Sequence, residues 1–375
     1  MYKRWNAFLQ QESFSGCLLV IMTLVALIWA NSSFAFLLQY FINTSVFWIN
    51  DGLMAIFFFL IGLELKREIV EGELSRPGQV MLPLAAAIGG MIVPALIYIA
   101  INFSSLHTVK GWATPVATDI AFALGVLSLF GRRVPIALKL FLLALAIFDD
   151  MGAIIIITFF YTHHLSYTAL FEAAVFVSWL FMLNMFSLPW MSIYLLLGVG
   201  LWSCLLTSGI HPTIAGVILA FFIPRGDILR RLEHLLRPWV AYFIMPLFVL
   251  ANAGISFSGM TVYFLFDKIV LGIVAGLFIG KQIGVLGFSW VFIRCKYASL
   301  PTHVSWRMLY GVSILCGMGF TMSLFLGTLS FHNEPWHLVA VRLGVIVGSI
   351  LSGLIGACVL LTAFSKEFQR SSSID

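Results

Sequence analysis

The stretch AIFDDMGAIIIITFFY, residues 146–161, holds two neighbouring aspartates, Asp149 and Asp150, inside an otherwise apolar run. No glycine–proline turn or polar loop interrupts the residues on either side, so both carboxyl groups are expected to lie within one apolar helix. A charged side chain at the centre of a bilayer costs roughly 2.5–3.5 kcal/mol on insertion scales. Two adjacent acids in such a place therefore indicate a function.

The composition of the chain indicates lipid as its solvent. Of its 375 residues 61% are hydrophobic and only 10% are charged, with a mean hydropathy of +1.04. Soluble domains are closer to half apolar and a quarter charged. The apolar runs are continuous rather than alternating, which favours helices over a barrel. The sequence therefore predicts an all-α polytopic membrane protein, formed by a single transporter domain over residues 1–375.

About twelve spans are predicted, from the roughly 20 residues that a helix needs to cross a bilayer. They cover residues 14–31, 46–66, 80–102, 115–130, 135–161, 166–186, 190–206, 208–223, 238–255, 269–292, 306–329 and 335–364. Residues 1–13 are expected to form a cytoplasmic N-terminal segment before a retained signal anchor. Residues 365–375 are expected to be a disordered cytoplasmic tail.

The distribution of basic residues predicts the orientation. If the N-terminus is cytoplasmic, the outer loops carry only Lys110 and Lys268, and the other loop lysines and arginines lie inside. Such an asymmetry sets membrane orientation and places both termini in the cytoplasm. It also accounts for the net charge of +5 without nucleic acid, which is not expected as a partner. Within spans, Lys139 and Arg342 lie nearer the ends, and snorkelling to the interface is expected for both.

Two of the predicted spans are interrupted. One is GWATPVATDIAFALGVLSLFGRR, residues 111–133, and the other is YGVSILCGMGFTMSLFLG, residues 310–327. Interrupted spans in the two halves of a chain indicate the binding site of a transporter. Glycine is common in transmembrane helices and could by itself explain either interrupted span. The acid in one of the two breaks favours a transporter binding site. The residues at these breaks are Thr118, Asp119, Gly317 and Gly319.

The two adjacent acids are suited to ion exchange. Burial and mutual repulsion favour the protonated form of at least one carboxyl group at cellular pH. Once deprotonated, Asp149 and Asp150 offer hard oxygen ligands to a small cation. The site can hold a cation or up to two protons but hardly both, and this competition couples the two flows. A structural salt bridge is the alternative interpretation.

Two further ionisable residues are expected near this site. Lys281 follows glycines that recur every four residues, a pattern for close helix packing, and we expect it to bind Asp149 or Asp150. Snorkelling is the alternative for the lysine. Asp119 is expected to offset the positive ends of helices that face the breaks, with a direct ion ligand or a helix cap as alternatives. The recurring glycines are Gly272, Gly276, Gly280 and Gly284.

A charged cluster is predicted on the cytoplasmic side. It combines GLELKREIVEGE, residues 62–73, with RLEHLLRPW, residues 231–239, the latter within a predicted amphipathic helix between two spans. The cluster could gather cations at the mouth of a funnel or report cytoplasmic pH, and a solvated charged rim is the alternative. Its residues are Glu64, Arg67, Glu68, Glu233 and His234.

At these motifs the sequence resembles the NhaA-type sodium/proton antiporters of bacterial inner membranes. Among the matching stretches are LALAIFDDMGAIIIITFFY, GWATPVATDIAFALGVLSLFG, SGIHPTIAGVILAFFIP and LCGMGFTMSLF. The resemblance implies inverted-topology repeats with two crossing interrupted helices. It implies a secondary transporter rather than an enzyme. Its expected activity is pH-regulated, electrogenic exchange of cytoplasmic Na⁺ or Li⁺ for external H⁺, without a cofactor, for sodium and pH homeostasis.

The resemblance also assigns roles to the residues singled out above. Asp150 matches the principal cation carboxylate, and Asp149 matches the neighbour that pairs with Lys281. Thr118 and Asp119 match the unwound segment. The cytoplasmic cluster matches the pH-response region.

The sequence departs from the family pattern at three places. Residues 31–48 are too short for the hairpin insertion that family members can carry, so any homodimer is expected to be weak and to form through lipid-bathed helices. Arg237 stands where a second pH-region histidine can occur, and a permanent charge cannot titrate near neutrality. Gln282 follows the lysine where proline is common.

Three rival functions share the intramembrane acids. A cation channel or an uncoupled cation transporter has them without proton coupling. An intramembrane aspartyl protease needs two carboxylates on facing helices, whereas Asp149 and Asp150 are adjacent on one helix and Asp119 is the only acid elsewhere that can serve as their partner.

Overall fold

The computed structural model describes residues 12–72, 77–162, 165–186, 190–332 and 334–371. Every regular element in these ranges is a helix, which confirms the predicted all-α class. The chain divides into two compact units. Unit 1 comprises Met1–Ser33, Arg76–Ala153 and Asn252–Asp375, and unit 2 comprises Phe34–Ser75 and Ile154–Ala251. The long helix α8 (Ile136–Phe160) begins in unit 1 and ends in unit 2.

The helices account for all twelve predicted spans. Within the described residues, eight helices are long and apolar enough to cross a membrane, and a ninth span is a pair of helices bent by 43° at a break. Shorter helices, α2 (Glu12–Ala30), α7 (Ile120–Ser128) and α11 (Ile214–Phe222), occupy the other three predicted spans. Short apolar helices are what interrupted or tightly connected spans produce.

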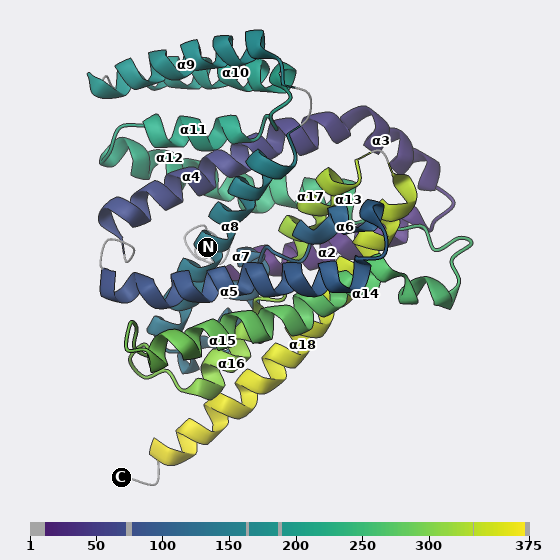
Figure 1. The fold of residues 1–375 in the computed structure, drawn as a ribbon, viewed down its shortest axis with the longest axis vertical. Helices are drawn as coiled ribbons and strands as arrows, with labels where there is room; N and C mark the ends of the chain where they lie inside the picture. The colour runs from purple at the N-terminus through teal and green to yellow at the C-terminus, as the bar shows by residue number, and fades with distance from the viewer. Residues whose placement is uncertain (1–11, 73–76, 163–164, 187–189, 333, 372–375) are drawn as a thin grey trace, which may run out of the picture. The chain divides into compact units, whose positions relative to one another are not determined.

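Unit 1 is built around helix α5 and the long C-terminal helix α18, both of which pack along α14 (Figure 1). Helix α5 also packs along α15, and α18 packs along α16 and α17. Short helices α6 (Leu106–Val109), η3 (Lys110–Ala113), η4 (Gly131–Arg133) and η6 (Val262–Phe266) connect the longer ones. Besides α2, α7 and α8, the other helices of unit 1 are α5 (Pro77–Asn102), α14 (Lys268–Ala275), α15 (Lys281–Arg294), α16 (Trp306–Leu315), α17 (Phe320–Ser330) and α18 (Pro335–Ser371). The π turn η7 (Gly276–Gly280) joins α14 to α15.

The predicted glycine face forms the contact between α5 and the continuous α14–η7–α15 helix. A Cβ on Gly284 would lie 2.1 Å from the Gly89 carbonyl oxygen, and one on Gly280 would lie 2.7 Å from the Cα of Pro94. Neither distance is possible for a real side chain. The missing side chains therefore let the two backbones touch, as small-residue faces do in lipid.

The two predicted breaks meet within unit 1. Helix α7 begins only after Asp119, and residues 316–319 separate α16 from α17. The backbone N–H of Asp119 donates to the Met318 carbonyl oxygen at 2.7 Å, so one break supplies a hydrogen-bond partner to the other. Non-helical backbone at membrane depth needs such internal partners. The prediction of two crossing interrupted helices is confirmed.

Unit 2 holds a second set of helices, in which α4 packs against α11. The contact is close because a Cβ on Gly216 would lie 2.1 Å from the Ala55 carbonyl oxygen. Besides α11 and the end of α8, the helices of unit 2 are α3 (Ala35–Phe47), η1 (Trp48–Leu53), α4 (Met54–Glu71), α9 (Tyr167–Met185), α10 (Met191–Ser208), α12 (Asp227–Trp239), η5 (Val240–Ile244) and α13 (Met245–Asn252).

Several predicted boundaries were wrong. The span expected to begin at residue 46 belongs to one helix that runs over Ala35–Glu71, because a π turn at Trp48–Leu53 carries the helix through Asn50, Asp51 and Gly52. The helices expected to be separate at residues 238–255 and upstream form one helix over Asp227–Asn252, again through a π turn, which follows Pro238.

Two smaller expectations also differ from the structure. Helix α18 continues to Ser371, into the tail predicted to be disordered, whereas residues 372–375 and residues 1–11 lie outside the described residues. The Arg342 guanidinium does not snorkel but donates to the Gly254 carbonyl oxygen at 2.7 Å. The single transporter domain stays a prediction.

The α5–α15 contact generates a test with an internal control. Gly284→Ala should lower the melting temperature, because its Cβ overlaps the Gly89 carbonyl and overpacking costs about 1–3 kcal/mol. Gly287 lies on the same helix with no atom within 4 Å of its added Cβ, so Gly287→Ala should leave stability unchanged or slightly higher. Fluorescence-monitored unfolding in detergent measures both. Equal melting temperatures for the two variants would contradict the close contact.

Candidate ion-binding site

Helix α8 carries the two central carboxyl groups into the interior of unit 1. Asp149 is 0% exposed and Asp150 is 1% exposed. The helix is continuous here because its flanks are strongly apolar and contain no proline. Successive residues of an α-helix point about 100° apart, so the two carboxyl groups face different neighbours.

Asp149 is the partner of the buried lysine. Its Oδ2 atom lies 2.6 Å from Nζ of Lys281, and both side chains are fully buried. The Thr118 hydroxyl donates to the same carboxylate oxygen at 2.6 Å, while the Oδ1 atom of Asp149 accepts no hydrogen bond from the described residues. Of the two candidates that the sequence left open, Asp149 therefore holds the ion pair.

Thr118 also connects the carboxylate to the second break. Its hydroxyl oxygen lies 2.9 Å from the Cys316 carbonyl oxygen, at the C-terminal end of α16. A hydroxyl group has only one proton to donate, so it serves the carboxylate and the carbonyl in alternation or shares one proton between them. The threonine thus joins the acid on α8 to the break between α16 and α17.

Asp119 caps two helices at once. One carboxylate oxygen accepts the backbone N–H of Phe122 at 3.2 Å, at the start of α7. The other accepts the backbone N–H of Thr321 at 3.0 Å, at the start of α17, and also the Thr321 hydroxyl. A carboxylate at the N-terminus of a helix offsets its partial positive charge. Asp119 is therefore a helix cap, one of the alternatives named from the sequence, and as a cap it lies at the positive helix ends that it was expected to offset.

The two break glycines are sites of close backbone approach. A Cβ on Gly317 would lie 2.3 Å from the Leu277 carbonyl oxygen, and one on Gly319 would lie 2.8 Å from the Ala117 carbonyl oxygen. Any side chain at either position would push these oxygens away. Glycine is therefore needed where the interrupted helix passes its neighbours.

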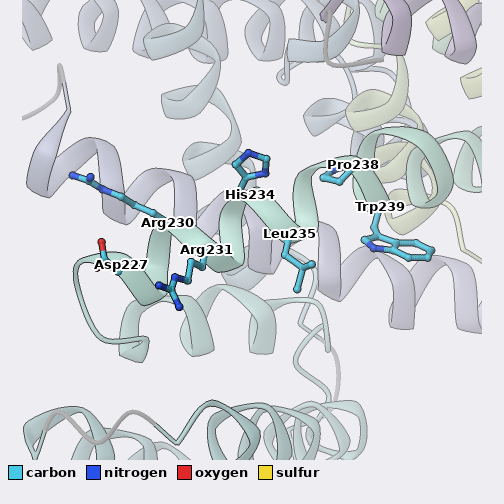
Figure 2. Close-up of a pocket in the computed structure, with 7 residues that line it drawn as sticks. All are labelled: Asp227, Arg230, Arg231, His234, Leu235, Pro238 and Trp239. Carbon is cyan, nitrogen blue, oxygen red and sulfur yellow. The ribbon is translucent and has the colours of Figure 1, made fainter. Parts of the chain in front are cut away.

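In unit 2 the two predicted cluster residues on α12, Glu233 and His234, lie on different faces of the helix. Figure 2 shows the outward face, on which Arg231 and His234 lie beside Leu235 and Trp239 along a pocket of about 630 Å³. Arg230 also lines this pocket, and its guanidinium pairs with Glu71 of α4 at 2.6 Å. His234 is exposed on this face, whereas its neighbour Glu233 is buried on the opposite one. The structure therefore does not bring His234 together with the other predicted residues.

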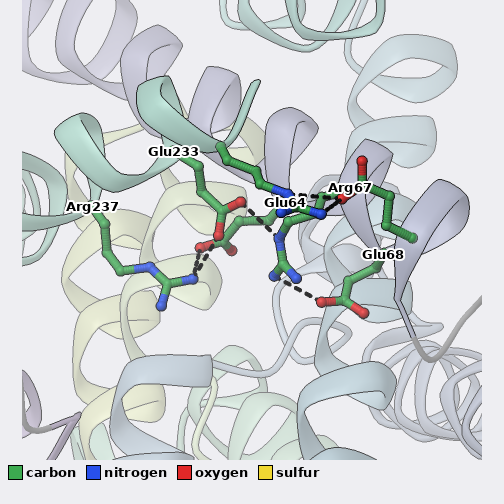
Figure 3. Close-up of polar contacts among 7 residues, drawn as sticks. Glu64, Arg67, Glu68, Glu233 and Arg237 are labelled. Carbon is green, nitrogen blue, oxygen red and sulfur yellow. Dashed lines mark hydrogen bonds and ion pairs between the residues drawn. The ribbon is translucent and has the colours of Figure 1, made fainter. Parts of the chain in front are cut away.

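The inward face of α12 forms an ion-pair network with α4 (Figure 3). Arg67 bonds through Nε to Glu233 at 2.7 Å and through an η nitrogen to Glu68 at 2.7 Å. Arg237 lies 2.9 Å from both Glu64 and Glu233. Glu233 is thus held between two arginines, and four of the five predicted residues meet in one network.

Arg237, within the predicted cytoplasmic stretch RLEHLLRPW, joins the network as well. Sequence reasoning missed two participants. Thr321 supplies both of its donors to Asp119, and its signal was its place directly after the second break. The Cys316 carbonyl accepts the Thr118 hydroxyl, and backbone groups leave no signal in a sequence.

This arrangement defines a class of protein. Paired buried carboxylates beside two interrupted helices, in a chain with at least eight apolar spans, are the features of an ion-coupled membrane transporter. The profile of the family described as Na⁺/H⁺ antiporter 1 matches residues 6–360. The chain therefore belongs to that family, and it is a Na⁺/H⁺ antiporter and a secondary transporter, not an enzyme.

Relatives match over almost their entire length. A Na⁺/H⁺ antiporter NhaA 1 of Syntrophotalea carbinolica is 50% identical over 98% of this chain and 98% of its own. A Na⁺/H⁺ antiporter NhaA of Rhodospirillum rubrum is 50% identical over 94% of this chain and 96% of its own. One from a Sulfurovum species is 47% identical over 97% and 99%. The recognition made from the motifs is confirmed.

The buried ion pair predicts that removing the lysine changes both the stability and the pH profile of the protein. Lys281→Ala should lower the free energy of unfolding by about 3–5 kcal/mol, because it leaves a buried carboxylate without its cation. It should also move the activity profile towards higher pH, since the carboxyl group then releases its proton less readily. Unfolding by differential scanning fluorimetry and exchange measured across pH in vesicles give the two values.

The double variant Asp149→Asn with Lys281→Met is the matched control for stability. Removing both charges should recover most of the lost stability, because replacing a buried ion pair by uncharged residues is often close to neutral. If Lys281→Ala changes neither the melting temperature nor the pH profile, the ion pair has no energetic role.

Proposed function

We propose that Asp149 and Asp150 bind the transported cation and the exchanged protons in competition. The observation that supports this role is the charge balance of the buried groups: one fully buried lysine accompanies two buried adjacent carboxyl groups. Repulsion between neighbouring carboxyl groups disfavours ionising both, and a proton or a cation bound at the pair relieves that repulsion. Either occupant satisfies the site, and each excludes the other.

The same charge balance explains electrogenic exchange. The pair carries one monovalent ion, Na⁺ or Li⁺, in one direction and returns with up to two protons. When two protons return for one cation, one net charge crosses the membrane in each cycle, so the membrane potential contributes to driving it. The ions are cargo, and the mechanism uses no cofactor.

The orientation and regulation follow from the charged loops and the network in unit 2. The asymmetry of basic loop residues supports a cytoplasmic location for both termini, and the resemblance to NhaA-type antiporters supports a place in a bacterial inner membrane. The network around Glu233 gathers cations and responds to cytoplasmic pH. It is supported by four carboxylate–arginine contacts of 2.7–2.9 Å. Lipid and the transported ions are the expected partners.

The rival functions fit the geometry less well. A protease would need two facing carboxylates, but Asp149 is bound to Lys281 and Asp119 accepts hydrogen bonds from two helix starts. A channel needs a continuous pathway, whereas both central acids are buried. Competition at a closed site favours coupled exchange.

The central prediction concerns Asp150→Asn. An amide keeps the shape and one oxygen ligand but cannot hold a charge or a transferable proton, so sodium-driven proton movement should fall to the background of empty vesicles. Proteoliposomes with a trapped pH-sensitive dye, given a sodium gradient, measure this directly. A lithium gradient in the same assay tests the second cation.

The matched control is Asp227→Asn, an exposed aspartate at the start of α12, which should exchange at the wild-type rate. Sodium flux without proton movement in the wild type would instead indicate a channel or an uncoupled transporter. Normal exchange by Asp150→Asn would rule out the proposed site.

The segment after the first span predicts a weak dimer. Residues 35–53 form helix α3 and a π turn rather than a hairpin extending from the membrane. Any dimer then depends on helix surfaces bathed in lipid, which have no hydrophobic driving force for association. Light scattering after size exclusion should show dissociation on dilution in detergent, with exchange retained. A dimer that persists at nanomolar protein would contradict this expectation.

A further inference from the structure

A π turn lies immediately before the buried lysine. Helices α14 and α15 are joined by the π turn Gly276–Gly280, and the backbone N–H of Lys281 donates to the Gly276 carbonyl oxygen, five residues back. A regular α-turn would use the residue four back. The extra residue turns everything after it by about 100° about the helix axis, compared with an uninterrupted α-helix. This turn therefore sets the direction of the lysine side chain relative to α14.

Gln282 completes the hydrogen bonding of this turn. Its side-chain Nε2 donates to the Phe278 carbonyl oxygen at 2.6 Å, which places a side-chain donor on a carbonyl of the widened turn. Its Oε1 accepts the Tyr310 hydroxyl at 3.0 Å, from the neighbouring helix α16. The amide thus fastens the π turn to α16 through both of its polar atoms.

The C-terminal end of helix α16 also contacts the candidate ion site. It ends at Leu315, and the carbonyl oxygen of the next residue, Cys316, lies 2.9 Å from the Thr118 hydroxyl. That hydroxyl contacts Asp149, which in turn binds Lys281. The contacts therefore form a closed circuit that starts and ends on α16, with the lysine between the π turn and the carboxylate.

The lysine has little freedom of its own within this circuit. Its side chain is 0% exposed and passes Gly90 of α5, where an added Cβ would lie 3.6 Å from Nζ. A side chain held in such a narrow space follows the backbone that carries it. A change in the π turn would therefore be transmitted to the ammonium group.

We propose that Gln282 and Tyr310 are positioning residues for the exchange reaction. Tyr310 orients the Gln282 amide, the amide keeps the π turn open, and the open turn directs Lys281 onto Asp149. The inference rests on the proposed function, in which Asp149 takes part in the exchange. Neither residue is one of the proposed ion ligands.

The test compares pH profiles of sodium-driven proton movement in proteoliposomes. Gln282→Met keeps the length of the side chain without its polar atoms, and its half-maximal pH should rise by about 0.5 unit, the equivalent of one hydrogen bond. Tyr310→Phe should shift in the same direction by less. The double variant should shift no further than Gln282→Met, because both act through one contact. The maximal rate at alkaline pH should be retained.

Two controls and one rescue variant sharpen the test. Gln39→Met and Tyr297→Phe make the same chemical changes at exposed positions and should keep the wild-type profile. Gln282→Pro should also keep it, because proline has no N–H and its ring clashes with the carbonyl four residues back, so the turn cannot close as an α-turn.

Each contrary result overturns a stated part of the proposal. A lower melting temperature with an unchanged profile in Gln282→Met would leave only a structural role for the amide. Additive shifts in the double variant would remove the shared pathway, and a shift in Gln282→Pro would remove the π turn from it. Lys281→Ala is measured alongside: if it shifts and Gln282→Met does not, the positioning role alone fails. If neither shifts, the proposed ion pair fails as well.

Discussion

The contact between Lys281 and Asp149 is the interaction on which the rest of unit 1 depends. Both groups are fully buried, at 2.6 Å, in a chain whose surroundings are apolar. A buried charge without its partner is strongly destabilising, so each side chain has to be delivered to the other with little tolerance. The glycine contacts between α5 and α15 serve this purpose, because they let the lysine-bearing helix approach within backbone contact. Close packing of α15 against α5 is thus needed to place the Lys281 ammonium group beside the Asp149 carboxylate.

The interrupted helices solve a second electrostatic problem near the same place. Breaking a helix within a membrane exposes N–H groups at one new end and carbonyl groups at the other, each with partial charge. Asp119 accepts from the starts of both α7 and α17, which leaves the carbonyl end of α16 to the Thr118 hydroxyl. Since this hydroxyl has one proton for two acceptors, the protonation state of Asp149 decides how it is shared. In the proposed mechanism, a change of occupant at Asp149 therefore alters the hydrogen bonding at the break directly.

Much of this site could be predicted from the sequence because its signals are local. Adjacent acids in an apolar run, glycines every fourth residue and interrupted spans are all visible without a structure. The choice of Asp149 over Asp150 as the lysine's partner was implied by the family resemblance but not by the spacing of the residues, because a π turn rotates the lysine and has no sequence signature. π turns also lie within the helices over residues 35–71 and 227–252, each of which the sequence analysis divided into separate segments. Where the helix register changes, spacing rules based on 3.6 residues per turn fail.

The sequence predicted one cluster that contains both Glu233 and His234, but the two side chains lie on different faces of α12. Glu233 faces inward, where it lies 2.7 Å from Arg67 and 2.9 Å from Arg237. His234 faces outward, beside Arg231 and Leu235. Two neighbouring residues of one helix therefore belong to different surroundings, as the 100° step between successive helical residues requires. A response of the inward network to pH has to arise from the network's own charged groups, which join α4 to α12.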